Sequence, residues 1–185
     1  MLILASRSPR RQELLQLLGV PFECRPTDCD EQCTLLHPAD HALELARRKA
    51  LAAEAVCDPE DVILSSDTVV FCDGMILGKP RDEEDAFRML RKLSGRTHTV
   101  CTAVAVRKGG RPHDLCSQTN VTFRELTDEQ IRRYIATGEP RDKAGAYGIQ
   151  GKGALLVEEI RGDYYTVVGL PVAKLARMFE ELSLL

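Results

Sequence analysis

Apolar positions along the chain follow two patterns: short β-branched runs and longer stretches with helical spacing. Nearly continuous apolar runs at residues 2–5 and 62–70 predict strands that are buried on both faces. Apolar residues that recur every three or four positions predict amphipathic helices over residues 38–56 and 82–93. Strands and amphipathic helices mixed along one chain predict an α/β fold.

Capping residues predict where three further helices begin. Ser8, followed by a proline, is a typical N-cap, and the apolar spacing predicts a helix over residues 10–18. Thr127 has the form of a capping-box residue that opens the next of these helices. Pro171 starts a C-terminal helix that we expect to reach residue 181.

Turn residues predict three hairpins. Asp73-Gly74 is a strong signal for a two-residue hairpin turn. Further turns are expected at residues 108–111 and around Gly162. The strands predicted beside these two turns are residues 97–106 with 117–124, and residues 154–160 with 164–168, and a separate short strand is expected at residues 21–26.

One carboxylate interrupts the apolar run at residues 62–70. Asp67 lies among three hydroxyl residues, Ser65, Ser66 and Thr68, with β-branched residues on both sides. Burying a carboxylate is unfavourable unless it meets a cation, a metal or several hydrogen bonds. Ligands of open α/β sheets bind where strands end, which favours a functional Asp67. The alternative is an aspartate that caps a strand end or a turn.

Cationic residues gather in three places. Arg7, Arg10 and Arg11 surround the start of the first helix, where positive charge opposes the helix dipole. A bound phosphate would offset these charges, although an exposed basic helix end explains them as well. Lys79 lies in a stiff Gly-Lys-Pro loop and faces either a phosphate or solvent. Spacing alone gives Lys49, on a helix with other basic residues, little weight.

The stretch from residue 137 to 154 holds five glycines. This density predicts a loop whose backbone approaches a ligand closely. Gln150 offers an amide that can donate and accept hydrogen bonds, as a base edge requires. A flexible linker is the alternative, but Ala144, Tyr147 and Ile149 argue against a solvated segment.

Composition limits the class of protein. The 185 residues fit one domain, or at most a domain with a lobe. The chain has 25 basic and 28 acidic residues, a net charge of −3, 5% aromatic residues and no Trp. These values, and the lack of a long apolar run, lead us to expect no nucleic-acid polymer as a partner and no membrane association. We expect a cytoplasmic protein.

Seven cysteines without paired spacing are typical of free thiols in a reducing compartment. One group, Cys29, Cys33, His37 and His41, recurs every four residues and raises the question of a zinc site. On a continuous helix these side chains would form a line rather than a tetrahedral shell, and Pro38 interrupts that helix. The sequence therefore disfavours zinc at this place.

Several nucleotide and hydrolase motifs are absent, among them the P-loop, a Gly-x-Gly-x-x-Gly after the first strand and a Gly-x-Ser-x-Gly elbow. Carboxylates, scattered Lys and Arg residues and glycine loops remain. This set suits Mg²⁺-assisted attack of water on a phosphorus centre. In such chemistry cations hold the phosphates and a carboxylate accepts the proton of the water.

Several segments together resemble the Maf family of nucleotide pyrophosphatases. In chain order they are residues 5–15, 46–50, 66–70, 78–80, 95–100, 138–151 and 168–171. They cover nearly the whole chain in the order that the family shows. The resemblance implies an α/β fold of the Maf/inosine-triphosphatase type for residues 1–185, with an elongated mixed central sheet flanked by helices and a cleft between two lobes.

The resemblance also implies hydrolysis of a nucleoside triphosphate to the monophosphate and pyrophosphate, with a divalent cation such as Mg²⁺ or Mn²⁺. The family's general base falls on Asp67, and its acidic metal partner falls on Glu31. The family's phosphate-binding residues fall on Ser6, Ser8, Arg11, Lys49 and Lys79. A homodimer is what the family suggests.

Three residues resemble the branch of the family that acts on dTTP and UTP: Arg10, Thr68 and Gln150. The sister branch, which acts on 7-methyl-GTP, has Glu-Gly where this chain has Gln150-Gly151. An amide can pair with the carbonyl and N–H groups of uracil or thymine, whereas a carboxylate would repel the carbonyls. Arg7 departs from the family pattern, in which many members have a small residue at this position.

Two other functions stay open at this point. One is a nucleotide-sensing regulator, for example of cell division or septum formation, whose hydrolysis is incidental. The other is a pyrophosphatase for 7-methyl-GTP or modified purines. Turnover measured over a panel of nucleotides distinguishes both from a house-cleaning enzyme for canonical and modified pyrimidine nucleotides.

Overall fold

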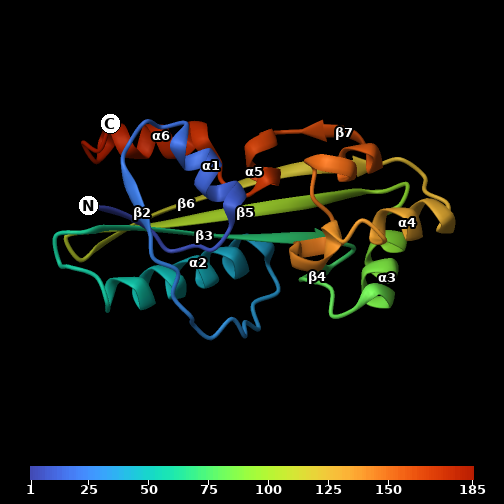
Figure 1. Cartoon of the computed structure of the whole chain (residues 1–185), viewed down its shortest axis with the longest axis horizontal. Coiled ribbons are helices and arrows are strands. Elements are labelled where there is room, and N and C mark those ends of the chain that lie inside the picture. The colour runs from blue at the N-terminus through green and yellow to red at the C-terminus, as the bar shows by residue number, and fades with distance from the viewer.

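A seven-stranded mixed sheet runs along the molecule in the computed structural model, which describes residues 1–185 (Figure 1). The strands are β1 Leu2–Leu4, β2 Phe22–Cys24, β3 Val62–Cys72, β4 Met75–Leu77, β5 Thr97–Lys108, β6 Arg111–Phe123 and β7 Val157–Arg161. Their order is β2-β1-β3-β5-β6-β7, and β4 pairs with β3. Strand β1 runs parallel to β2 and β3, and every other pair is antiparallel.

Helices flank this sheet. They are α1 Pro9–Gln16, α2 Pro38–Glu54, α3 Glu83–Leu93, α4 Asp128–Ile135, α5 Tyr164–Val168 and α6 Val172–Glu181, with 3₁₀ turns η1 Glu139–Asp142, η2 Ala144–Ala146 and η3 Gly151–Leu156. Figure 1 shows α2 on one side of the sheet, α1, α5 and α6 on the other, and α3 with α4 at the end away from the two termini. The expected elongated α/β architecture is confirmed. None of these helices is both long and apolar enough to span a bilayer.

Helix α2 lies close to the sheet because small residues form its buried stripe. Ala42, Ala46, Ala50 and Ala53 recur about every four residues and are completely buried. They belong to one apolar cluster with residues of β3 and β5. The Ser65 hydroxyl on β3 donates a hydrogen bond to the Ala46 carbonyl. This close packing fixes the position of the middle turn of α2 relative to the centre of β3.

Most predicted elements are present with shifted ends. Ser8 caps α1, and Thr127 and Gln130 form the complete capping box of α4. The strands of the long hairpin extend to residues 108 and 111, so that only Gly109 and Gly110 connect them. The first helix ends at Gln16 instead of residue 18.

The prediction of a third hairpin was wrong. Residues 164–168 form helix α5, and β7 begins at Val157, pairs with β6 and follows the 3₁₀ turn η3. The Asp163 carboxylate accepts hydrogen bonds from the backbone N–H groups of Tyr165 (3.3 Å) and Thr166 (2.8 Å) and so caps a helix. A run of five apolar and β-branched residues does not distinguish a strand from a helix by periodicity, and this cap decides the outcome.

Candidate active site

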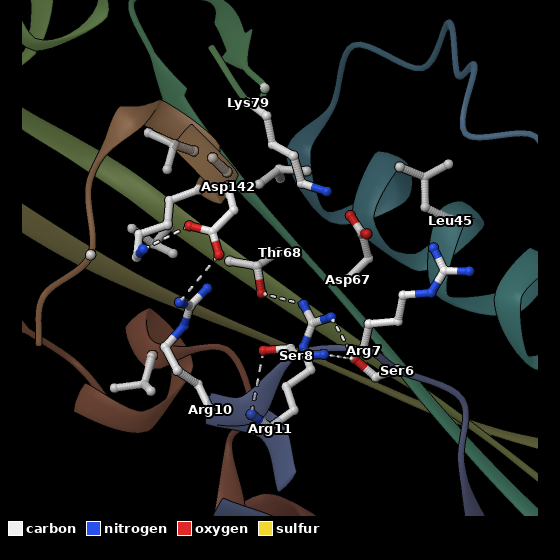
Figure 2. Close-up of a pocket in the computed structure, with 18 of the residues that line it drawn as sticks. Ser6, Arg7, Ser8, Arg10, Arg11, Leu45, Asp67, Thr68, Lys79 and Asp142 are labelled. Carbon is white, nitrogen blue, oxygen red and sulfur yellow. Dashed lines mark hydrogen bonds and ion pairs between the residues drawn. The ribbon is translucent and has the colours of Figure 1, made fainter. Parts of the chain in front are cut away.

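A cavity of about 810 Å³ lies where β3, the loop before α1 and the glycine-rich segment meet. Every residue proposed for the site from the sequence lines it: Ser6, Ser8, Arg10, Arg11, Glu31, Lys49, Asp67, Thr68, Lys79 and Gln150. These residues come from six separate parts of the chain, so the fold brings them together. Figure 2 shows the Asp67 carboxylate and the Lys79 amine pointing into the same part of the cavity.

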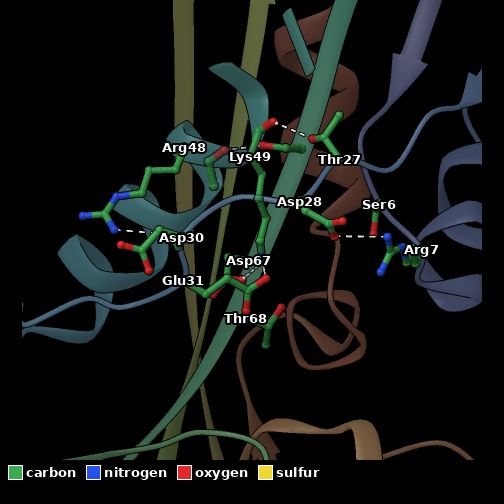
Figure 3. Close-up of polar contacts among 12 residues, drawn as sticks. Ser6, Arg7, Thr27, Asp28, Asp30, Glu31, Arg48, Lys49, Asp67 and Thr68 are labelled. Carbon is green, nitrogen blue, oxygen red and sulfur yellow. Dashed lines mark hydrogen bonds and ion pairs between the residues drawn. The ribbon is translucent and has the colours of Figure 1, made fainter. Parts of the chain in front are cut away.

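The charged centre of the cavity is formed by Asp67, Lys49 and Glu31. Lys49 Nζ lies 2.6 Å from Asp67 Oδ1 and 3.1 Å from Glu31 Oε1, so one ammonium joins two carboxylates (Figure 3). The Lys49 and Asp67 side chains are only 15% and 12% exposed. Burial alone would lower the pKa of Lys49, but Asp67 and Glu31 raise it above its usual value. Lys49 is therefore charged at neutral pH.

Glu31 differs from Asp67 in exposure. Its side chain is 53% exposed and lies in the irregular segment between β2 and α2. Desolvation raises the pKa of Glu31, but the contact with Lys49 and the charges of Lys79 and Arg11 together outweigh it, so that the pKa lies below its usual value. The segment is held against α2 because Thr27 Oγ1 donates to the Lys49 carbonyl (3.4 Å) and the Arg48 side chain donates to the Gln32 carbonyl (2.7 Å).

Arg11 crosses from α1 to the other side of the site. Its Nε donates to the Gly169 carbonyl at 3.0 Å, and its guanidinium reaches Thr68 Oγ1 at 3.2 Å and Ser6 Oγ at 3.5 Å. Burial lowers the pKa of Arg11, and the charge of Asp67 opposes that shift. Arg11 is thus a positioned cation with three contacts.

Thr68 belongs to a chain of hydroxyl groups under the site. Thr68 Oγ1 lies 2.8 Å from Thr102 Oγ1, and Thr102 in turn donates to the Thr166 carbonyl at 2.7 Å. Since Thr68 also accepts from Arg11, its hydroxyl is occupied within the protein. Its position links β3, β5 and α5 to the Arg11 side chain.

Three predicted residues lie at the rim of the cavity. Arg10 approaches Asp142, with 4.0 Å between Arg10 Nη1 and Asp142 Oδ2. Lys79 is exposed and has no ion pair within 4 Å. Gln150 is exposed and directly precedes η3. All three are available to a ligand in the cavity.

Comparison with known proteins identifies the family. A family model described as "Maf-like protein" matches residues 1–182. The chain belongs to the Maf family. This confirms the resemblance that the sequence motifs indicate.

Relatives of this Maf chain share about half of its residues. A protein of Thermococcus kodakarensis is 52% identical over 172 residues, which cover 93% of this chain and 92% of the relative. A protein of Bacillus velezensis is 50% identical over 184 residues, covering 99% and 97% of the two chains. Both relatives are named dTTP/UTP pyrophosphatase. A solved structure described as a HAM1 protein from Coxiella burnetii has a TM-score of 0.54 at 15% identity, over 97% of this chain and 98% of that one, and supports the fold.

One carboxylate that sequence reasoning missed organises the glycine-rich wall of the Maf cavity. Glu139 accepts hydrogen bonds from the backbone N–H groups of Lys152 (3.0 Å) and Gly153 (3.2 Å), on either side of its carboxylate. Gly151 has φ +62°, and a Cβ there would lie 2.8 Å from Glu139 Oε1. The glycine thus permits the approach of the carboxylate that holds the turn after Gln150. The spacing of the glycines predicted that the backbone approaches another group closely, but it did not show that this group is Glu139.

The Maf site also fits a divalent cation. Asp67 and Glu31 provide hard carboxylate oxygens, and both already lie against one positive charge, that of Lys49. No group of three His, Cys, Asp or Glu side chains is placed to hold a metal ion. Mg²⁺ is typically bound by one or two carboxylates together with substrate phosphates and water, which matches this donor set.

Proposed function

We propose that this Maf protein hydrolyses dTTP and UTP to the monophosphate and pyrophosphate, and that it also removes modified pyrimidine nucleotides in a house-cleaning role. The observation that carries the proposal is Asp67, a buried carboxylate that lines one cavity together with the cations Arg11, Lys49 and Lys79. The names of relatives about 50% identical to this chain support the same activity.

The cations and hydroxyl groups suit a triphosphate. Arg11 and Lys49 are held in place by buried contacts, whereas Lys79 is free of ion pairs and can follow the ligand. Ser6 and Ser8 lie where the loop before α1 turns, and the Ser6 hydroxyl accepts from the backbone N–H of Ser8 at 3.2 Å. The cavity volume of about 810 Å³ lies within the range of small-molecule sites.

Asp67 has the geometry of a general base. Its Oδ1 accepts a hydrogen bond from Lys49, and its Oδ2 makes no hydrogen bond within the protein. Oδ2 is therefore available to take a proton from a water molecule as that water attacks phosphorus and the bond between the α- and β-phosphates breaks. The Lys49 ammonium holds the carboxylate in place through this contact. A divalent cation held by Asp67 and Glu31 would neutralise charge on the phosphates.

We assign selectivity for the base to residues at the rim of the cavity. The Gln150 amide can donate to a carbonyl and accept from the N–H of uracil or thymine. Arg10 is half-buried next to Asp142 and lies at the same rim. Thr68, whose hydroxyl is occupied by Arg11 and Thr102, would act by placing Arg11 rather than by meeting the base.

A nucleotide panel with detection of pyrophosphate tests the proposal. We expect the highest kcat/KM for dTTP and UTP, and loss of turnover when Mg²⁺ and Mn²⁺ are omitted. A preference for 7-methyl-GTP would place the protein in the purine-specific branch. Nucleotide binding with negligible turnover would make it a sensor. A cytoplasmic location and a homodimer stay predictions from the sequence.

A further inference from the structure

Two cysteines meet on the face of the sheet that α2 covers. Cys101 on β5 and Cys116 on β6 have their Sγ atoms 3.0 Å apart. In the strand register Cys101 lies opposite Gln118 and Cys116 lies opposite Ala103, so the two cysteines are diagonal neighbours. Cys101 belongs to the apolar cluster that includes the alanines of α2, and Cys116 packs against that cluster.

The two thiols differ in access and acidity. Cys101 is completely buried, whereas Cys116 is only half-buried. The hydrogen bond from Cys101 lowers the pKa of Cys116 to about 7, and the same contact raises the pKa of Cys101. Cys116 is thus the more acidic of the two thiols, and the thiolate is the nucleophilic form of cysteine.

We propose that Cys101 and Cys116 form a redox site in which a hydroperoxide generates a disulfide that slows turnover at Asp67. The Cys116 thiolate attacks the peroxide, the O–O bond breaks, and a sulfenic acid and hydroxide form. Cys101 then attacks the Cys116 sulfur, the S–O bond breaks, and water leaves with the proton of the Cys101 thiol. The peroxide is reduced, and the two thiols lose two electrons and two protons. A dithiol reductant reverses the change.

The strand register suits a bond that is reversible rather than structural. A disulfide has sulfur atoms about 2.05 Å apart, so the two Sγ atoms must approach by about 1 Å. Diagonal pairs across antiparallel strands are separated more widely than pairs directly opposite. The bond therefore draws β5 and β6 together locally, and strained disulfides of this kind are the readily reduced ones.

The strand register also connects this pair to the active site. Asp67 lies opposite Ala103, and Ala103 on its other side lies opposite Cys116. Cys101 lies opposite Val69 on β3. The next residue, Thr102, lies opposite Thr68, and the hydroxyl groups of these two threonines form a hydrogen bond. Movement of β5 at residues 101–103 therefore reaches Asp67 and Thr68 through backbone pairing. A displacement of about 1 Å at a reacting group can lower the rate by up to ~10²-fold.

Peptide mapping tests the bond directly. The reduced full-length protein is treated with hydrogen peroxide, alkylated and digested with trypsin without reductant. Cleavage after Arg96, Arg107 and Lys108 yields peptides 97–107 and 109–124, each with a single cysteine. We expect these two peptides joined and two hydrogens lighter than their sum. Recovery of both as separate alkylated or over-oxidised peptides would overturn the proposal.

Turnover before and after peroxide tests the consequence, and this part rests on the proposed function. We expect kcat/KM for dTTP to fall by about tenfold and to recover with dithiothreitol. The variant C116S should keep the reduced rate and lose the response. The matched control C29S removes a half-buried cysteine on the segment that carries Glu31, and should respond like the wild type. An unchanged rate in cross-linked protein, or an equal loss in C116S, would overturn the regulatory role. Absent turnover in the reduced protein would instead count against the proposed function.

Discussion

The two walls of the cavity are built in different ways. The wall that carries Asp67 consists of regular elements, with a buried ion pair to Lys49 and a three-contact Arg11. The opposite wall, residues 138–153, consists of 3₁₀ turns and irregular chain, and its Gln150 is exposed. Within that wall, two backbone N–H groups donate to one carboxylate, that of Glu139.

In the proposed function, this difference separates the residues of the chemical step from those that select the base. Groups on strands and long helices are held more precisely than groups on loops, as proton transfer requires. Loops tolerate substitution more readily, which suits recognition of one base among several. Substitutions in the first wall should therefore lower kcat, and those in the second should change KM or substrate preference.

The largest effect is expected for Asp67→Asn. The amide keeps the size of the side chain and a hydrogen-bond acceptor for Lys49, but it cannot take a proton. Loss of a general base typically lowers the rate by about 10²–10⁴-fold, and we expect kcat for dTTP to fall by about 10³-fold or more. Release of pyrophosphate gives the rate, and calorimetric titration with nucleotide should show binding within a few-fold of the wild type. Near wild-type turnover would remove Asp67 from the role of base.

A substitution in the second wall, Gln150→Glu, should change preference rather than abolish turnover. A carboxylate repels the carbonyls of uracil and thymine, and an unpaired polar group costs about 1–3 kcal/mol. The ratio of kcat/KM for dTTP over 7-methyl-GTP should fall by about 10- to 100-fold. Gln150→Ala serves as the control, because it should lower kcat/KM for dTTP without raising kcat/KM for 7-methyl-GTP. An unchanged ratio in the Glu variant would show that Gln150 does not read the base.

The variant Glu139→Gln tests whether the Glu139 carboxylate holds the second wall in position. The variant keeps the shape of the side chain but removes the charge that accepts from two backbone N–H groups. Hydrogen bonds to a charged group are worth about 1 kcal/mol more than neutral ones, so we expect KM for dTTP to rise by about fivefold with kcat within about twofold. The matched control is Glu129→Gln on α4, whose side chain is 82% exposed and pairs with Arg133. A fall in kcat with KM unchanged would place Glu139 with the chemistry instead.

The two walls also differ in how far the sequence predicts them. The apolar run around Asp67 and the caps Ser8 and Thr127 are local signals, and each predicted element formed. Lys49 carried little weight by spacing, because its role depends on how α2 lies against β3. Only the resemblance to the family predicted Lys49 as a residue of the site.

Contacts across the chain explain what the sequence did not show. The Glu139 carboxylate accepts hydrogen bonds from Lys152 and Gly153, which lie more than ten residues later in the chain. Three short 3₁₀ turns make up most of this segment, and its sequence has no hydrophobic periodicity that would predict the contact. The meeting of Cys101 and Cys116 depends on the register of a hairpin whose turn proved two residues long. Because the Asp163 side chain caps the backbone at Thr166, residues 164–168 form helix α5 instead of the predicted strand.

The smallest effect is expected from a buried group behind the second wall, His98. Its Nε2 lies 2.7 Å from the Tyr147 hydroxyl, and its Nδ1 is buried without a partner. Burial lowers the pKa of His98 to about 4. In the unfolded chain its pKa is about 6.5, so between these values the unfolded state binds a proton that the folded state does not. The free energy of unfolding should therefore fall as the pH falls, by about 1 kcal/mol between pH 7.5 and 5.5 from this residue alone.

Urea unfolding at the two pH values measures this contribution. The variant His98→Gln keeps an amide that can bond to the Tyr147 hydroxyl but does not titrate, so its stability should change less with pH by about that amount. The variant His113→Gln on β6, at a more accessible position, controls for the loss of a histidine as such. Since His98 lies behind Tyr147 rather than in the cavity, kcat at pH 7.5 should stay within about twofold. Equal pH dependence in the wild type and His98→Gln would show that burial does not lower the pKa of His98.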